Sequence, residues 1–162
     1  MRKERIRWIP DLDLHIKLAS INEKGIKDLD SVKVKLQEVV EGMSEFITTV
    51  RGFGNIGSHS LSAGIDQTPE FLMLRDRIND VIGEFKNPDP IDFVPNVLIA
   101  RINSLIEKRM FFKLIDANRL IEFDDIRVKE VCLMSTELMS YGPHVAIEDR
   151  FSLKEIHEEV LA

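Results

Sequence analysis

The sequence predicts an α+β fold, in which antiparallel sheets are covered by helices. Several short segments alternate apolar and polar residues, which is typical of half-buried strands, and two longer segments carry matching apolar stripes at helical spacing. Strands are expected in neighbouring pairs between the helices, and this order favours hairpins over a doubly wound parallel sheet. A chain of 162 residues can form one domain or two small lobes that share a core.

The amino-terminal half is expected to contain a strand, a helix and then two strands. Alternation over residues 12–18 predicts the first strand, and residues 28–31 offer the capping chemistry that opens a helix. The apolar residues of this helix fall on one stripe: Val32, Leu36, Val39, Val40 and Met43. Two further strands are predicted at residues 46–50 and 60–65, with a glycine-rich turn at residues 52–57 between them.

The carboxyl-terminal half begins with a strong helix signal at Thr68, Pro69 and Glu70. A capping hydroxyl precedes a proline, which suits the first turn, and an acid, which suits the positive end of the helix dipole. The remaining elements are predicted in this order: a strand at residues 96–102, a helix at 104–122, a hairpin of 126–138 and 145–153 around a turn at 140–143, and a short charged helix at 154–161.

Composition narrows the classes of function. With 22 Lys and Arg against 28 Asp and Glu, the net charge is −6, so duplex DNA binding through a broad basic surface is not expected, whereas a small phosphate site is compatible. No apolar run approaches the ~20 residues of a membrane span. The single cysteine, Cys132, excludes an intramolecular disulfide and a cysteine-rich zinc site. The basic amino terminus lacks the apolar stretch of a signal peptide, so we expect a cytoplasmic location.

His15 and Lys17 lie two positions apart on the first predicted strand, so both are expected on the face opposite Leu14, Ile16 and Leu18. A neutral imidazole can exchange a proton near neutral pH, and a nearby ammonium can hold a phosphate. Two ordinary solvated side chains are the alternative interpretation. A divalent metal bound by Asp11, Asp13 and His15, which would share that strand face, is another.

Two segments resemble the signatures of the two-histidine phosphoesterases, in the branch of the 2′-5′ RNA ligases and RNA 2′,3′-cyclic phosphodiesterases. Residues 7–10 with 14–18 (RWIP and LHIKL) resemble the first signature, and residues 93–101 (FVPNVLIAR) resemble the second. The glycine-rich turn and the last hairpin follow the family order. The resemblance implies one two-lobed domain over residues 1–162, with antiparallel sheets, flanking helices and a central cleft, and it implies no cofactor or metal.

The signatures also depart from the family pattern. His15 is kept, but Lys17 replaces the first threonine, Asn96 replaces the second histidine and Leu98 the second threonine. The resemblance implies that His15 is a catalytic acid or base. It implies that phosphate is bound by Lys17, Asn96, Arg101 and Arg150. Because asparagine cannot accept and return a proton, we expect a protein that binds an RNA terminus or nucleotide phosphate, with weak or lost phosphodiesterase activity.

A non-catalytic interaction module with a vestigial cleft is the alternative function. Family members usually carry a strand and a helix before the first signature, and only residues 1–6 precede it here. An uncovered sheet edge invites pairing, so we expect a homodimer. Residues 1–6 forming an edge strand of their own, or the 154–161 helix covering a face, are the alternatives within the chain.

Overall fold

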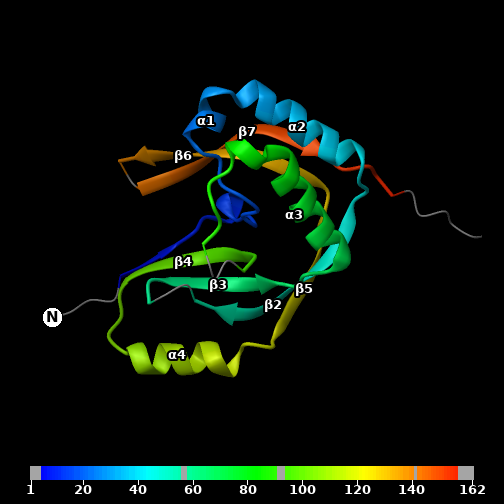
Figure 1. The fold of residues 1–162 in the computed structure, drawn as a ribbon. Coiled ribbons are helices and arrows are strands. Elements are labelled where there is room, and N and C mark those ends of the chain that lie inside the picture. The colour runs from blue at the N-terminus through cyan, green and yellow to red at the C-terminus, as the bar shows by residue number, and fades with distance from the viewer. Residues whose placement is uncertain (1–4, 56–57, 91–93, 141, 157–162) are drawn as a thin grey trace, which may run out of the picture. The chain divides into compact units, whose positions relative to one another are not determined.

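The computed structural model describes residues 5–55, 58–90, 94–140 and 142–156, and Figure 1 shows its ribbon. The chain divides into two compact units. The first unit comprises Met1–Leu18, Thr48–Gln67 and Ile91–Ile126, and the second comprises Ala19–Ile47, Thr68–Pro90 and Arg127–Ala162. Each unit is therefore built from three separate stretches of sequence.

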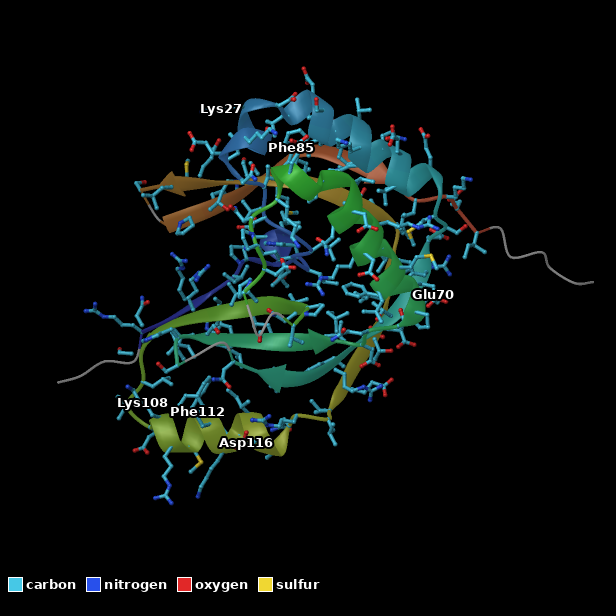
Figure 2. All side chains as sticks on the ribbon, in the orientation of Figure 1. Lys27, Glu70, Phe85, Lys108, Phe112 and Asp116 are labelled. Carbon is cyan, nitrogen blue, oxygen red and sulfur yellow. The ribbon has the colours of Figure 1, made fainter. Side chains whose placement is uncertain are left out.

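A five-stranded sheet forms the first unit, in the order β1-β4-β3-β2-β5. Its strands are β1 (Arg5–Trp8), β2 (Phe46–Gly54), β3 (Ser60–Ile65), β4 (Asn96–Ser104) and β5 (Glu122–Val128). β4 pairs antiparallel with both β1 and β3, and β3 pairs antiparallel with β2. The helix α4 (Lys108–Ala117) belongs to the same unit, and Figure 2 marks Lys108, Phe112 and Asp116 along it. β4 is thus the strand on which both β1 and β3 are aligned.

A β-bulge in β2 requires a glycine at position 52. β2 advances two residues, from Arg51 to Phe53, while β3 advances one, and the extra residue Gly52 has a φ of 75°. That backbone conformation favours glycine, because a side chain would meet the preceding carbonyl. A Cβ atom at Gly52 would also lie 2.0 Å from the carbonyl oxygen of Arg119. The glycine therefore lets β2 approach the segment that follows α4.

The second unit packs helices on a two-stranded antiparallel sheet of β6 (Glu130–Met139) and β7 (Gly142–Ser152). Its helices are α1 (Glu23–Lys27), α2 (Leu29–Glu41), α3 (Pro69–Ile82) and the 3-10 turn η2 (Gly83–Phe85). The Asp28 side chain accepts a hydrogen bond from the Ser31 amide at the start of α2, and Thr68 does the same for Phe71 at the start of α3. Both predicted helix starts are confirmed.

Burial confirms the predicted apolar stripe of α2. The stripe residues Val32, Leu36, Val39, Val40 and Met43 are all buried, as are Leu74, Ile78 and Ile82 of α3. The short helix α1 was not predicted. It is possible because Gly25 is buried against Phe85, whose Cβ would lie 2.9 Å from a Cβ at position 25. Figure 2 shows Phe85 beside α1, so this helix depends on tertiary packing more than on its own sequence.

Three predicted elements differ in the structure. Residues 12–18 do not form a strand: Pro10 leads into the 3-10 turn η1 (Asp11–Asp13), in which the Asp13 amide donates to the Pro10 carbonyl, and within this range the one bridge is that of Ile16. The predicted strand at 126–138 is divided between β5 and β6, which belong to different sheets. Lys154 forms a parallel β-bridge with Ser44, so the predicted closing helix does not begin at Lys154. The rest of that predicted helix, residues 157–161, lies outside the described residues.

The α+β class with two antiparallel sheets and flanking helices is confirmed. The edge strand β1 (Arg5–Trp8) overlaps the start of the first signature, and of the segment 1–6 suggested as an edge strand only Arg5 and Ile6 lie within the described residues. In the described part of the chain, no helix has the length and apolar character needed to cross a membrane.

Candidate functional site

The two signature segments pair with each other inside the first unit. Ile16 forms an antiparallel bridge with Val97. In antiparallel pairing the flanking residues lie opposite one another, so His15 is adjacent to Leu98 and Lys17 to Asn96. Because side chains alternate along a strand, these four side chains share the face that Ile16 and Val97 do not occupy. His15 and Lys17 therefore share a face as predicted, but the single bridge of Ile16 with Val97 sets this arrangement and not a full strand.

His15 has an imidazole that is oriented by the chain beside it. Its Nδ1 lies 2.8 Å from the carbonyl oxygen of Asp13. A carbonyl oxygen only accepts hydrogen bonds, so Nδ1 carries the proton and the neutral ring has its lone pair on Nε2. This is the arrangement that a general base requires. The residue as a whole is half-buried.

Asn96 makes the same local hydrogen bond as His15. Its Nδ2 donates to the carbonyl oxygen of Val94 at 2.8 Å, and in both cases the acceptor lies two residues earlier in the chain. The Nδ2 of asparagine and the Nδ1 of histidine are separated from Cα by the same number of bonds. Asn96 therefore keeps the orienting half of an imidazole and lacks the half that would carry Nε2.

A β-bulge in β4 brings Arg101 onto the face of Asn96 and Leu98. Leu98 lies opposite Ser62 and Ala100 opposite Leu61, so two residues that are consecutive on β3 face residues two apart on β4. Consecutive residues of β3 point to opposite faces of the sheet, so their partners Leu98 and Ala100 also point to opposite faces. Arg101, the next residue after Ala100, therefore points to the same face as Leu98. Burial agrees with this assignment, because Ala100 is fully buried while Arg101 is exposed.

Arg7 joins this surface through β1, where it lies directly opposite Arg101. We call the surface formed by these side chains the β4 face; its residues are Arg7, His15, Lys17, Asn96, Leu98 and Arg101. Arg7 was missed as a site residue in the sequence analysis. The pattern Arg5-Ile6-Arg7-Trp8 could have indicated it, since alternating cationic and apolar residues predict a strand with both arginines on one side.

The cations of the β4 face carry no ion pair with any described residue. Lys17 and Arg101 are exposed and Arg7 is half-buried, and no carboxylate oxygen of the described residues lies within salt-bridge distance of these three. Four predicted site residues, His15, Lys17, Asn96 and Arg101, are thus brought together on a surface with excess positive charge. Such a surface attracts an anion.

Arg150, the fifth predicted site residue, lies in the second unit. It stands on β7 opposite Cys132, and its guanidinium pairs with Glu130 of β6. This ion pair gives Arg150 a role in the hairpin that sequence analysis did not anticipate. Phosphate binding by Arg150 stays a prediction.

The strand face suggested for a metal does not exist. Asp11 and Asp13 are part of the turn η1, so they do not alternate with His15 along a strand. Across residues 5–55, 58–90, 94–140 and 142–156, no group of three or more His, Cys, Asp or Glu side chains could hold a metal ion.

A pocket of about 580 Å³ lies in the second unit, and no predicted site residue is among its lining residues. Its wall includes the buried Glu45, whose carboxylate accepts from Arg127 at 2.9 Å and from the Ile156 amide at 3.3 Å. Both acceptor contacts tie the carboxyl-terminal segments to the start of β2. The pocket carboxylate therefore has a structural role.

Comparison with solved structures identifies the fold. TT0787 of Thermus thermophilus aligns with a TM-score of 0.69 and 19% identity, over 94% of this chain and 84% of that chain. E. coli LigT in its apo form aligns with a TM-score of 0.68 and 15% identity, over 91% of this chain and 80% of LigT. A structure described as a phosphoesterase aligns with the same TM-score of 0.68 and 15% identity, over 91% of this chain and 81% of that chain. LigT has also been solved with 3′-AMP, ATP, phosphate and NADP+.

Sequence comparison adds no relative: no protein-family model and no curated protein matches the chain. The structural likeness nevertheless spans about nine-tenths of the chain in each of these three structures. The fold expected from the signature resemblance is confirmed: the chain has a LigT-like fold.

Proposed function

We propose that this chain binds the phosphate of an RNA terminus or a nucleotide on the β4 face, with weak or lost phosphodiesterase activity. The observation that carries the proposal is the pair of matched hydrogen bonds from His15 and Asn96, each 2.8 Å to the carbonyl two residues earlier. Position 15 has both the oriented hydrogen bond and the proton-exchanging ring of a histidine. Position 96 has the same oriented hydrogen bond but, as an asparagine, no group that exchanges a proton. The solved complexes of LigT with 3′-AMP and phosphate support the ligand class.

Each side chain of the proposed site has a distinct role. The Nε2 of His15 takes or returns one proton, and Lys17 with Arg101 holds phosphate oxygens by charge-assisted hydrogen bonds. The second amide hydrogen of Asn96 is a further donor, and Leu98 offers none. Loss of one acid–base group typically costs about 10² to 10⁴ in rate, which is why we propose that turnover is slow.

The proposal also includes the second unit. We propose that residues 1–162 act as one functional domain and that Arg150 supplies a further phosphate contact. Arg150 must then exchange Glu130 for a phosphate oxygen, an exchange between two charge-assisted hydrogen bonds of similar kind. A cytoplasmic location stays a prediction.

Calorimetric titration with 3′-AMP tests the binding proposal. Lys17→Gln is expected to weaken binding about tenfold, because a charge-assisted contact to phosphate is lost. His15→Ala is expected to weaken it less, through loss of one hydrogen bond. Lys113→Gln on α4 and His144→Ala on β7 are matched controls and are expected to leave affinity within about twofold. Wild-type protein that binds no 3′-AMP at millimolar concentration would contradict the proposal.

A second candidate function, self-association, is favoured by the hairpin of the second unit. β6 and β7 form a sheet of two strands within the described residues, and at its turn end Leu138 is 86% exposed and Met139 40% exposed. Free edges beside exposed apolar side chains invite pairing with another chain. We propose a homodimer that buries this end of the hairpin.

Sedimentation equilibrium decides the homodimer. Wild-type protein at micromolar concentration is expected at twice the chain mass of 18.6 kDa. Leu138→Lys is expected to shift the mass towards that of one chain, because a charge would be placed in the contact. Leu12→Lys is the matched control, since Leu12 is equally exposed but lies in η1 of the first unit. A single-chain mass for the wild type would rule out the homodimer.

A further inference from the structure

Ser62 of β3 carries a hydroxyl that the described part of the chain leaves without a hydrogen bond. The residue is only 4% exposed, yet no described residue donates to its Oγ or accepts from it. Buried polar groups in proteins nearly always have a partner. Thr48 of β2, in the same sheet, follows this rule, because its buried Oγ1 donates to the Asp66 carbonyl at 2.7 Å. The Ser62 hydroxyl therefore has no structural role comparable to that of Thr48.

The register of β3 on β4 places Ser62 on the same side of the sheet as the β4 face. Ser62 is the direct antiparallel partner of Leu98, and direct partners share a face. Figure 1 shows β3 beside β4 in the first unit. On the other edge of β4, the bridge from Ile16 to Val97 puts His15 next to Leu98. Leu98, which has no polar group, is thus flanked by a hydroxyl on one side and an imidazole on the other.

The Ser62 hydroxyl is accessible although the residue as a whole is buried. Gly54 of β2 lies directly opposite Ser62. Apart from its own chain neighbours, a Cβ atom at position 54 would meet one atom of the described residues within 4 Å, the Ser62 Oγ at 3.6 Å. The face is therefore open beside the hydroxyl. The oxygen is also not among the described polar atoms that are fully enclosed without a partner, so it retains contact with solvent.

We propose that the Ser62 hydroxyl donates a hydrogen bond to a phosphate oxygen of the ligand on the β4 face, where Leu98 offers no donor. A serine hydroxyl can donate and a phosphate oxygen accepts, which gives a charge-assisted hydrogen bond. A phosphate above Leu98 is approached by His15 from one side and by Ser62 from the other. This inference rests on the proposed function and adds a phosphate-binding residue from β3, which neither signature segment contains.

Calorimetric titrations with 3′-AMP and with inorganic phosphate, paired with urea titrations, test the role of Ser62. Ser62→Ala is expected to weaken the binding of both ligands about fivefold, because one hydrogen bond to the phosphate is lost. Its urea midpoint is expected to stay unchanged, because no described residue loses a partner. Thr48→Val is the matched control in the same sheet. It is expected to lower the urea midpoint and to leave both affinities within twofold, since its hydroxyl bonds only Asp66 among the described residues.

Rescue from the opposite strand supplies a readout that a structural role would not change. Leu98→Thr places a hydroxyl directly across from position 62. In the Ser62→Ala background, this second change is expected to restore 3′-AMP affinity to within about twofold of the wild type. In the wild-type background it is expected to improve affinity by a smaller factor, because Ser62 already supplies the donor.

The outcomes separate this inference from the proposed function. If the wild type binds 3′-AMP and Ser62→Ala binds it equally well, the role of Ser62 is overturned and the proposed function stands. A lowered urea midpoint in Ser62→Ala, an equal loss of affinity in Thr48→Val, or no rescue by Leu98→Thr would also overturn it. A loss for 3′-AMP without a loss for inorganic phosphate would overturn the phosphate contact, because Ser62 would then contact the nucleoside. If the wild type binds neither ligand, both proposals fail.

Discussion

The two units place their cationic side chains in opposite settings. In the second unit at least five cations face an acid; the pairs are Lys33 with Asp149, Arg75 and Lys86 with Asp89, Arg127 with Glu45, and Arg150 with Glu130. In the first unit, Arg51 is paired with Asp66 and Glu122, but Arg7, Lys17 and Arg101 of the β4 face are paired with no described acid.

This difference separates two uses of positive charge. A cation with an acid beside it contributes to folding, because the carboxylate compensates its loss of water. A group of cations on one face, without acids, lowers stability slightly and is available to an external anion. Removing an acid from the second unit should therefore destabilise the protein, whereas removing a cation from the β4 face should not.

The largest effect on stability is expected at Glu45. Its side chain is 6% exposed and accepts hydrogen bonds from Arg127 and from the Ile156 amide. Glu45→Gln keeps the shape but removes the charge opposite Arg127, so we expect a loss of about 2 kcal/mol in the free energy of unfolding, measured by urea titration. Glu70→Gln, on the wall of the same pocket, is the control and is expected to cost at most about 1 kcal/mol, because it removes only the acid at the start of α3. Equal effects would contradict a structural role for Glu45.

A smaller effect is expected at Asp89, which lies 2.7 Å from Lys86 and 3.2 Å from Arg75. The hydrogen bond from Lys86, together with the charges of both cations, lowers the pKa of Asp89 below its ordinary value of 3.8. Because the folded-state pKa is lowered, the stabilisation is complete above the unfolded pKa and is lost as pH falls through the folded pKa. Asp89→Asn is expected to cost about 1–2 kcal/mol at pH 7.

The pH dependence of that loss is the sharper test. The difference between the wild type and Asp89→Asn should be constant above about pH 5 and should shrink as the pH falls below the ordinary carboxyl pKa. Urea titrations at several pH values measure it. Asp76→Asn, an exposed acid on α3, should show no such convergence. A difference that persists unchanged at pH 2 would rule out the charge of Asp89 as the cause.

The smallest effect has the opposite sign. Arg7→Gln removes one of two facing cations, so it is expected to raise the free energy of unfolding by about 0.2–1 kcal/mol at low salt. The gain should disappear near 1 M salt, where the screening length is about 3 Å. Arg5→Gln should show no gain, because Arg5 lies opposite Ser104. A loss of stability in Arg7→Gln would show that the guanidinium has a structural partner.

Local sequence signals predicted the elements that are determined locally. Asp28 and Thr68 cap their helices as expected, and the apolar stripe of α2 is buried. The failures occur where tertiary contacts compete with local pattern. Residues 12–18 alternate like a strand, yet Pro10 directs the chain into a turn, and α1 forms because Gly25 packs against Phe85.

The candidate site was predictable in its residues and not in its geometry. The signature resemblance selected His15, Lys17, Asn96 and Arg101, which the structure places on one face. Neither the hydrogen bonds to Asp13 and Val94 nor the bulge that turns Arg101 towards this face has a sequence signal, because each depends on pairing between distant segments. Arg7 was missed although its strand has a sequence signal, and its register with Arg101 places it beside the predicted residues.

The central claim is that the site keeps the orientation of two histidines and the chemistry of one. Turnover of a hexaribonucleotide ending in a 2′,3′-cyclic phosphate tests it in the Asn96→His variant, with Asn118→His on the same unit as control. Because the hydrogen bond to Val94 already orients position 96, we predict a rate about 10²-fold above the wild type, and loss of that gain when His15→Ala is added. No gain in Asn96→His, or a gain that survives His15→Ala, would contradict the account.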